Sequence, residues 1–348
     1  MVVCYNKHMQ KGWQKETGFT IVELLVVVVV IGVLTTIIFV SYSGIQNRAV
    51  VASLQSDLNN ASKKIMMDQV VNGEYPASLV LANDGKGINP SPGTSYDYVR
   101  NNSTNSPGFC LEAIYNNIAY KITESTNPIL GNCDDYGLVL NIDSGNTSSY
   151  PGSGNVVYDL TGLNTSISSY NASLGFSENA FDFTSSNTDG LTVQNNNFTN
   201  LRDFTVECVF KLGGTHYHYD GTLVSSGDWN NTHWSFGVDQ ANTAVKTRRP
   251  HTNTPYSFSL NTWYHITFTR LGTKFIIYIN GSKLAEYNIY DAIPLVSGWS
   301  NTGIGRETYA GGYFNLNGKI SIVKIYNRAL SIDKVVENFE SIRTRYGI

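Results

Sequence analysis

The distribution of apolar and polar residues first predicts one long helix. An almost unbroken apolar run, Leu24–Val40, contains no charged residue. About 20 such residues in a helix span the roughly 30 Å hydrocarbon core of a bilayer. Apolar residues then recur at helical spacing over Ala49–Met66, which indicates that the same helix continues as an amphipathic segment. Asn72–Gly73, followed by Pro76, is a typical helix stop.

Beyond residue 73 the pattern changes from helical spacing to alternation. Two alternating runs, Phe109–Tyr115 and Ile118–Ile122, flank Asn116–Asn117 and predict a β-hairpin. A stretch rich in Gly, Ser and Asn, residues 143–155, is predicted to be a linker. Regular short strands separated by turn signals follow it and predict a two-sheet sandwich or jelly roll. The clearest of these strands are Phe204–Phe210, Gly221–Ser225, Trp234–Val238, Tyr264–Arg270, Phe275–Asn280 and Lys319–Tyr326.

The residues before the apolar run differ from an ordinary secretory signal. Three lysines and a single Glu precede Gly18, and such a positive flank keeps the N-terminus in the cytoplasm. A secretory signal has a shorter apolar region, with its cleavage site after that region. Here the candidate cut after Gly18 lies before the run, so cleavage would leave the helix on the mature protein. Glu23 costs about 2–3 kcal/mol or more in lipid and therefore requires a partner.

The segment Lys15–Leu25, with the sequence KETGFTIVELL, resembles the class III signal of type IV prepilins and pseudopilins. The resemblance implies that a prepilin peptidase cuts between Gly18 and Phe19 and that Phe19 is N-methylated. It also implies that Glu23 neutralises the Phe19 amine of a neighbouring subunit during assembly with other pilin subunits. The alternative is a plain single-pass anchor that contains a Glu.

Many helices of that family have a proline near the end of the apolar half, and this run has none. Gly32 and Gly44 are then the candidate soft points of the helix, since glycine costs about 1 kcal/mol relative to alanine inside a helix.

The C-terminal strands resemble the laminin-G-like, concanavalin A-like jelly rolls over nearly all of residues 156–348. The segments that match are Phe204–Phe210, Asn261–Arg270, Phe275–Gly281, Ile304–Gly305 and Gly318–Ser331. We therefore predict a multidomain chain, α+β and then all-β, in which a long N-terminal helix and a small pilin-type β head precede an antiparallel β-sandwich. The predicted parts are a leader (1–18), a transmembrane and amphipathic helix (19–72), the head (73–142), the linker (143–155) and the jelly roll (156–348).

Composition and cysteine placement favour an exported protein. The formal net charge is −3, and loss of three Lys and one Glu with the leader brings it to about −5. The only tight basic cluster is Lys246, Arg248 and Arg249, so no nucleic-acid partner is expected, and the low charged fraction of 15% suits an extracellular β-rich protein. Cys110 and Cys133 flank a short β-like segment and are the natural disulfide pair in an oxidising compartment. Cys208 lies in an apolar strand and is expected to be a buried thiol, whereas Cys4 would leave with the leader.

The acidic residues do not suggest an enzyme. Jelly-roll glycan hydrolases use two carboxylates about 5 to 10 Å apart, and these usually alternate along one strand. No such alternation occurs here, because the candidate residues are scattered along the chain: Glu178, Glu207, Glu286 and Glu307. We therefore predict no catalytic residue.

Ligand spacing predicts no cofactor or metal site. His216 and His218 would share one face of a strand, but no third zinc ligand is evident, and a polar surface hairpin is the favoured interpretation. Calcium is an option through loop carboxylates at Asp189, Asp220 and Asp228, although their spacing singles out none of them.

A ligand-binding rim is the favoured site. Aromatic rings stack on sugars, and Arg side chains bond hydroxyls or carboxylates. The candidate residues are Tyr217, Tyr219, Trp229, His233, Arg248 and Arg249. The alternative is that about half of the aromatic rings in this region pack in the core. Trp234 and Trp263 lie in strand patterns and are expected there rather than at a ligand.

These features predict a minor or tip type IV pilin-like protein that adheres to a surface glycan or protein. It would be a single-pass protein of the inner or cytoplasmic membrane before assembly and part of an extracellular filament afterwards. The roughly 200 additional residues would crowd the dense helical array of a major pilin. The alternatives are a pseudopilin of a secretion or DNA-uptake system and a membrane-tethered glycan hydrolase.

Overall fold

The structure of the 348-residue chain is a computed structural model. It describes residues 20–101, 107–164, 167–169, 175–183, 190–194, 203–216, 220–226, 234–248, 250–289, 301–307 and 314–348, with the side chains of 37–44 excepted.

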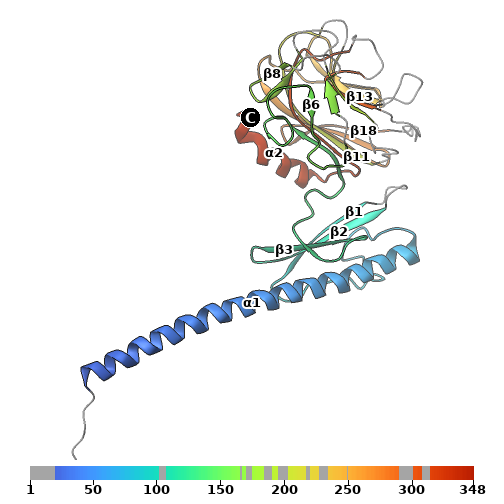
Figure 1. Ribbon diagram of the computed structural model, residues 1–348. Coiled ribbons are helices and arrows are strands. Elements are labelled where there is room, and N and C mark those ends of the chain that lie inside the picture. The colour runs from blue at the N-terminus through green and yellow to red at the C-terminus, as the bar shows by residue number, and fades with distance from the viewer. Residues whose placement is uncertain are drawn as a thin grey trace, which may run out of the picture.

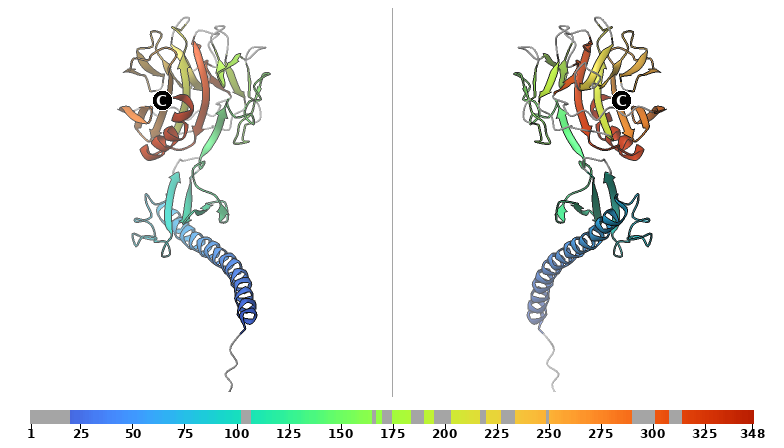
Figure 2. Two further views of the ribbon diagram at one scale, coloured as in Figure 1. Left: turned by 90° about the vertical axis from the view of Figure 1, so that its left-hand side faces the viewer. Right: turned by 90° about the vertical axis from the view of Figure 1, so that its right-hand side faces the viewer.

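A single long helix, α1 (Ile21–Asn72), begins the described chain. Its 52 residues correspond to about 78 Å. The helix continues without a break through Gly32 and Gly44, and Figure 2 shows that it curves along its length. It ends at Asn72 as predicted, where Gly73 adopts the left-handed conformation at φ 80° and donates its N–H to the Gln69 carbonyl. Among the residues whose side chains the structure describes, no helical segment combines the length and apolarity of a membrane span.

A four-stranded antiparallel sheet packs on the second half of α1. Its strands, in spatial order, are β1 (Ser95–Asn101), β2 (Gly108–Tyr115), β3 (Ile118–Thr123) and β4 (Ile129–Leu130). The helix contributes residues that share one face at i, i+4, i+7 and i+11, and the sheet contributes alternate residues of β2. The buried side chains are Leu54, Leu58, Ala61, Ile65, Phe109, Leu111 and Ala113. The predicted hairpin is confirmed, because β2 and β3 pair across Asn116–Asn117 with Tyr115 opposite Ile118.

Two carboxylates of α1, the buried Asp68 and the partly buried Asp57, secure the turn segment that follows the helix. Asp68 accepts the N–H groups of Asn83 at 2.6 Å and Asp84 at 3.2 Å. Both of those residues have positive φ, at 58° and 57°. Asp57 accepts the Ser91 hydroxyl at 2.8 Å and its N–H at 3.2 Å. Since these bonds join residues distant in sequence, they fix the path of residues 83–91 along the helix.

The predicted linker is wrong, and so is the predicted end of the head at residue 142. Strand β5 (Leu138–Asp143) pairs with β20 (Gly318–Tyr326), so that the chain enters the jelly-roll sheet directly from the head. Tyr150, in the middle of the predicted linker, is 2% exposed and belongs to the jelly-roll core. Arg345 binds both carboxylate oxygens of Asp143 at 2.8 Å. The Gly, Ser and Asn residues of this stretch therefore form turns packed on the sandwich.

The rest of the chain forms a sandwich of two antiparallel sheets (Figure 1). The first has the order β15 (Thr252–Pro255), β14 (Ala244–Arg248), β13 (Trp234–Val238), β12 (Gly221–Ser226), β19 (Asn301–Ile304), β10 (Leu191–Gln194), β7 (Ile167–Ser169) and β6 (Val156–Val157). The second has the order β18 (Ser282–Asn288), β17 (Lys274–Ile279), β16 (Trp263–Leu271), β11 (Phe204–Leu212), β20, β9 (Ala180–Asp182) and β8 (Gly175–Ser177).

Aromatic residues from both sheets meet in the sandwich core. Trp234 is 1% exposed, and its ring stacks on Phe236 with centroids 4.7 Å apart. Phe236 in turn stacks on Phe268 of the opposite sheet at 4.5 Å. Cys208 is fully buried in the same core, as predicted. Trp263 differs from its prediction, because it is only partly buried and packs on Tyr346 near the C-terminus.

A C-terminal helix, α2 (Ile332–Tyr346), covers the outer face of the second sheet. Its Asn338 side chain donates to both carboxylate oxygens of Glu207 at 3.0 Å, and Phe339 stacks on His265. Burial raises the pKa of Glu207 to about 7 and lowers the pKa of His265 to about 3. Both groups are enclosed, so Glu207 belongs to the helix–sheet contact rather than to an open site.

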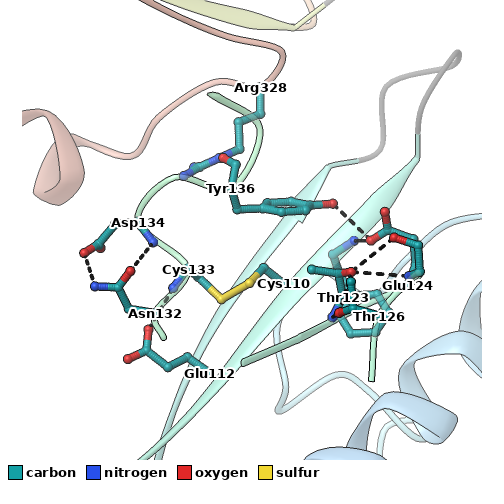
Figure 3. Close-up of a disulfide and its surroundings, with 12 residues drawn as sticks. Cys110, Glu112, Thr123, Glu124, Thr126, Asn132, Cys133, Asp134, Tyr136 and Arg328 are labelled. Atoms are coloured by element: carbon teal, nitrogen blue, oxygen red, sulfur yellow. Dashed lines mark hydrogen bonds between the residues drawn. A yellow bond between two sulfur atoms is a disulfide. The ribbon is translucent and has the colours of Figure 1, made fainter. Parts of the chain in front are cut away.

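A disulfide-linked segment, residues 131–137, joins the head to the jelly roll and is named here the junction segment (Figure 3). Cys110 of β2 and Cys133 form the predicted disulfide. On the jelly-roll side, Lys334 pairs with Asp134 at 2.5 Å, and Arg328 donates its Nε–H to the Tyr136 carbonyl at 2.6 Å. The disulfide therefore connects the sheet of the head to the segment that the jelly roll binds.

Candidate ligand-binding pocket

The outer face of the first jelly-roll sheet carries a polar pocket of about 270 Å³. Trp234, Phe236 and Val238 of β13 point into the core, so that Ser235 and Gly237 between them face outward. On the neighbouring strand β14, Arg248 is paired with Ser235, and Lys246 is paired with Gly237. The pocket is lined by Asp220, Gly221, Thr222, Ser235, Gly237, Lys246, Thr247, Arg248, His251, Thr252, Asn253 and Glu307.

Glycine at position 237 is required by the close approach of β12 and β13. A Cβ placed there would lie 2.1 Å from the carbonyl oxygen of Gly221, which is a backbone atom. The backbones of the two strands therefore approach closely in the wall of the pocket, and only glycine fits at position 237.

Glu307 lies in the wall of the pocket directly after β19 and is only 2% exposed. Its Oε1 accepts the Ser235 hydroxyl at 3.1 Å and lies 3.6 Å from the Arg248 guanidinium. Among the described residues, its Oε2 has no hydrogen-bond partner. Burial raises the pKa of Glu307, and the Arg248 charge and the Ser235 hydroxyl act in the opposite direction. Leaving a buried acceptor unpaired costs about 1–3 kcal/mol, and more when it is charged.

The remaining charges of the pocket balance one another. Asp220 precedes β12, and burial raises its pKa while Lys246 and Arg248 act to lower it. The Arg248 guanidinium lies over the Phe314 ring, 4.1 Å from the ring centroid, which fixes its position. Two carboxylates and two cations therefore share one site, with an exposed imidazole, His251, at its edge.

Of the predicted rim residues, Arg248 lines this pocket. The other predicted members, Tyr217, Tyr219, Trp229, His233 and Arg249, lie outside the described residues. Gly18 and Phe19 of the cleavage site also lie outside the described residues, as do His218, Asp189 and Asp228. Those assignments stay predictions.

His216 is buried, so its predicted place on a polar surface hairpin is wrong. It is 3% exposed, its Nδ1 accepts the Asn317 N–H at 3.1 Å, and burial lowers its pKa to about 4. Within the described ranges, no group of three or more His, Cys, Asp or Glu side chains is arranged to hold a metal ion. Calcium binding through loop carboxylates stays a prediction.

Sequence reasoning missed the association of Asp220 and Glu307. Neither residue lies in an alternating acidic pattern. Asp220 precedes β12 and Glu307 follows β19, so the two residues lie close together only because these strands pair. Two other acidic candidates lie elsewhere, since Glu178 pairs with Lys211 and Glu286 pairs with Lys274 and Lys283.

At the other end of the molecule, Glu23 caps its own helix. Its Oε2 accepts the Thr20 N–H at 2.9 Å and the Thr20 hydroxyl at 2.8 Å, while the Thr20 hydroxyl accepts the Glu23 N–H at 3.2 Å. This reciprocal arrangement is a capping box. The pattern Thr20-x-x-Glu23 could have been recognised from the sequence. Pairing of Glu23 with the Phe19 amine of a neighbouring subunit stays a prediction.

Comparison with known families confirms both resemblances. Residues 13–39 match the prokaryotic N-terminal methylation motif. Residues 185–336 match a laminin-G-type family of the concanavalin A-like lectin/glucanases superfamily. The chain therefore combines a type IV prepilin-type N-terminal signal with a laminin-G-like jelly roll. No curated protein matches this chain.

Several solved structures are similar to the jelly-roll part. Domain 4 of AbnA, a GH43 extracellular arabinanase from Geobacillus stearothermophilus, in complex with arabinotriose, is 14% identical, covering 57% of this chain and 97% of that one, with a TM-score of 0.44. The binding domain of botulinum neurotoxin DC, in complex with rat synaptotagmin II, is 15% identical, covering 61% of this chain and 52% of that one, with a TM-score of 0.45. The binding domain of Paraclostridial Mosquitocidal Protein 1 is 20% identical, covering 60% and 53%, with a TM-score of 0.45. The chain spans about half the length of the latter two.

Proposed function

We propose that this protein is a pilin-like subunit that is cut before Phe19 by a prepilin peptidase, assembles through α1 into a surface filament and binds a glycan in the pocket of its jelly roll. The methylation motif supports the processing and assembly steps. The first half of α1 supports them too, because its apolar side chains are exposed along Ile21–Leu34, from 84% at Ile21 to 54% at Leu34. Such a surface is suited first to lipid and then to the helices of other subunits.

The position of the pocket is the observation that carries this proposal. The pocket lies on the jelly roll, and the sheet of the head separates the jelly roll from α1 (Figure 1). A subunit held in a filament through α1 therefore has its pocket outside the helical core of that filament. The bulk of the jelly roll favours a minor or tip subunit, because heads of this size would crowd a filament built from them alone.

The assembly part is tested by mutating Glu23 in cells. We expect Glu23→Ala to abolish recovery of the protein in sheared surface filaments while it remains in the membrane fraction. Glu340→Ala, which removes an exposed carboxylate of α2, is the matched control and should leave recovery unchanged. Equal recovery of Glu23→Ala and wild type in filaments would contradict the proposed assembly.

The same fractionation separates a pilus from a pseudopilus. A pilus subunit appears in purified surface filaments, whereas a pseudopilin of a secretion or DNA-uptake system stays with the envelope. Detection of the wild-type protein only in the envelope fraction would therefore favour the pseudopilin alternative.

One observation favours glycan hydrolysis as the second candidate function. Asp220 and Glu307 line one pocket, and burial raises the pKa of each, as is common for catalytic acids. We favour binding because Arg248 and Ser235 both stabilise the Glu307 carboxylate. Release of reducing ends from a polysaccharide panel by the wild type, and its loss in Glu307→Gln, would establish the hydrolase instead.

A further inference from the structure

We propose that the pocket selects neutral, hydroxyl-rich glycans over acidic ones and that Glu307 determines this specificity. The inference rests on the proposed glycan-binding function and deepens it by naming the ligand class. It follows from the charges in the pocket and from the hydrogen bonds between the side chains that line the pocket.

The cations of the pocket are matched by carboxylates and do not form an anion site. Arg248 faces the Glu307 carboxylate at 3.6 Å and is held over Phe314. Lys246 lies on the same strand, and its charge acts on Asp220. An acidic sugar in the pocket would lie beside both carboxylates as well as both cations, so that repulsion offsets the attraction. A cationic ligand would likewise be repelled by Arg248 and Lys246.

A neutral sugar satisfies both kinds of group. Each sugar hydroxyl can donate one hydrogen bond and accept another, so that it can join a carboxylate to a neighbouring cation. Glu307 can accept from such a donor, because Ser235 satisfies Oε1 and no described residue satisfies Oε2. The hydroxyl and amide groups of Thr222, Thr252 and Asn253 extend the same chemistry around the pocket.

Hydrogen bonds to charged groups are stronger than those between neutral groups, and loss of one weakens binding about 10- to 100-fold. Glu307→Gln keeps the shape of the side chain but removes its charge. This variant should therefore weaken the binding of neutral glycans by that factor and at the same time reduce the repulsion of acidic ones.

The test is a glycan array probed with the full mature chain in detergent. The array contains neutral oligosaccharides together with uronate-containing, sialylated and sulfated ones. We expect the wild type to bind neutral members, Glu307→Gln to bind them 10- to 100-fold more weakly with a smaller preference over acidic members, and Glu286→Gln to match the wild type. Glu286 is the control because it is paired with lysines on the opposite sheet and lies outside the pocket.

Each failure has a distinct meaning. Preferential binding of acidic glycans by the wild type would overturn the selectivity and leave glycan binding in place. Unchanged binding by folded Glu307→Gln would overturn the role of Glu307. Binding of no glycan by the wild type would overturn both this inference and the glycan part of the proposed function. The wild-type comparison requires no variant, so it decides the selectivity even if Glu307→Gln does not fold.

Discussion

Removal of the Cys110–Cys133 disulfide should loosen the head and leave the jelly-roll core intact. The two cysteines are 23 residues apart in the sequence and join β2 to the junction segment. In the chain-entropy treatment, closing a loop of this length contributes about 3.4 kcal/mol at 25 °C, chiefly by restricting the unfolded chain. Because both cysteines are buried, the double variant Cys110→Ala/Cys133→Ala is preferred to serine, which would bury two hydroxyls.

Amide hydrogen exchange is the appropriate assay, since a chain with two separate cores need not unfold in one step. Some amides of β2 and β3 exchange only when the head opens. A loss of about 3.4 kcal/mol should increase the exchange rate of these amides about 300-fold. Amides of β11 and β16 in the sandwich should keep their rates. Cys208→Ala is the matched control, because it removes a buried sulfur from the sandwich without breaking a cross-link. It should accelerate exchange only in the sandwich.

Two results would contradict this prediction. Exchange in β2 and β3 that changes by less than about threefold would mean that the loop closure contributes little to the head. Equal acceleration in β11 and β16 would mean that the head and the jelly roll open as one unit rather than as two.

Two further predictions concern buried carboxylates. Burial raises the pKa of Glu207 to about 7, so the folded state retains a proton that an unfolded carboxyl with a pKa near 4.3 releases. The resulting stability is complete below about pH 4 and is lost as the pH rises to about 7. The free energy of unfolding of the wild type, relative to that of Glu207→Gln, should therefore be about 3 kcal/mol larger near pH 4 than near pH 8. Denaturant titrations at the two pH values measure this difference, and a difference that does not change with pH would contradict the prediction. Asp68→Ala should destabilise the head by about 2–3 kcal/mol, because it removes the acceptor of the Asn83 and Asp84 N–H groups; an unchanged head transition in thermal melts would show that water replaces those bonds.

Features encoded locally could be predicted from the sequence. The helix stop at Gly73 depends on one residue in the left-handed conformation, and the β2–β3 hairpin depends on a two-residue turn at Asn116–Asn117. The methylation motif is a contiguous pattern, and burial of Trp234 follows from alternation within its strand. Each of these depends on residues close together in the chain.

Features that depend on distant pairing could not be predicted in the same way. Leu138, Leu140 and Ile142 alternate as a strand should, but their partner β20 lies near the other end of the chain. Composition alone therefore suggested a boundary and a linker where the jelly roll already begins. The pocket has the same origin, because Glu307 meets Ser235 only through the order of β13, β12 and β19 in the sheet.

Processing and assembly as a pilin-like subunit would leave a specific N-terminus on the mature chain. Mass spectrometry of the N-terminal peptide, on protein isolated from native surface filaments, identifies that N-terminus. We expect a peptide that begins at Phe19 and carries one additional methyl group on its amine. A peptide that retains Met1 and the lysine-containing leader through Gly18 would contradict this expectation.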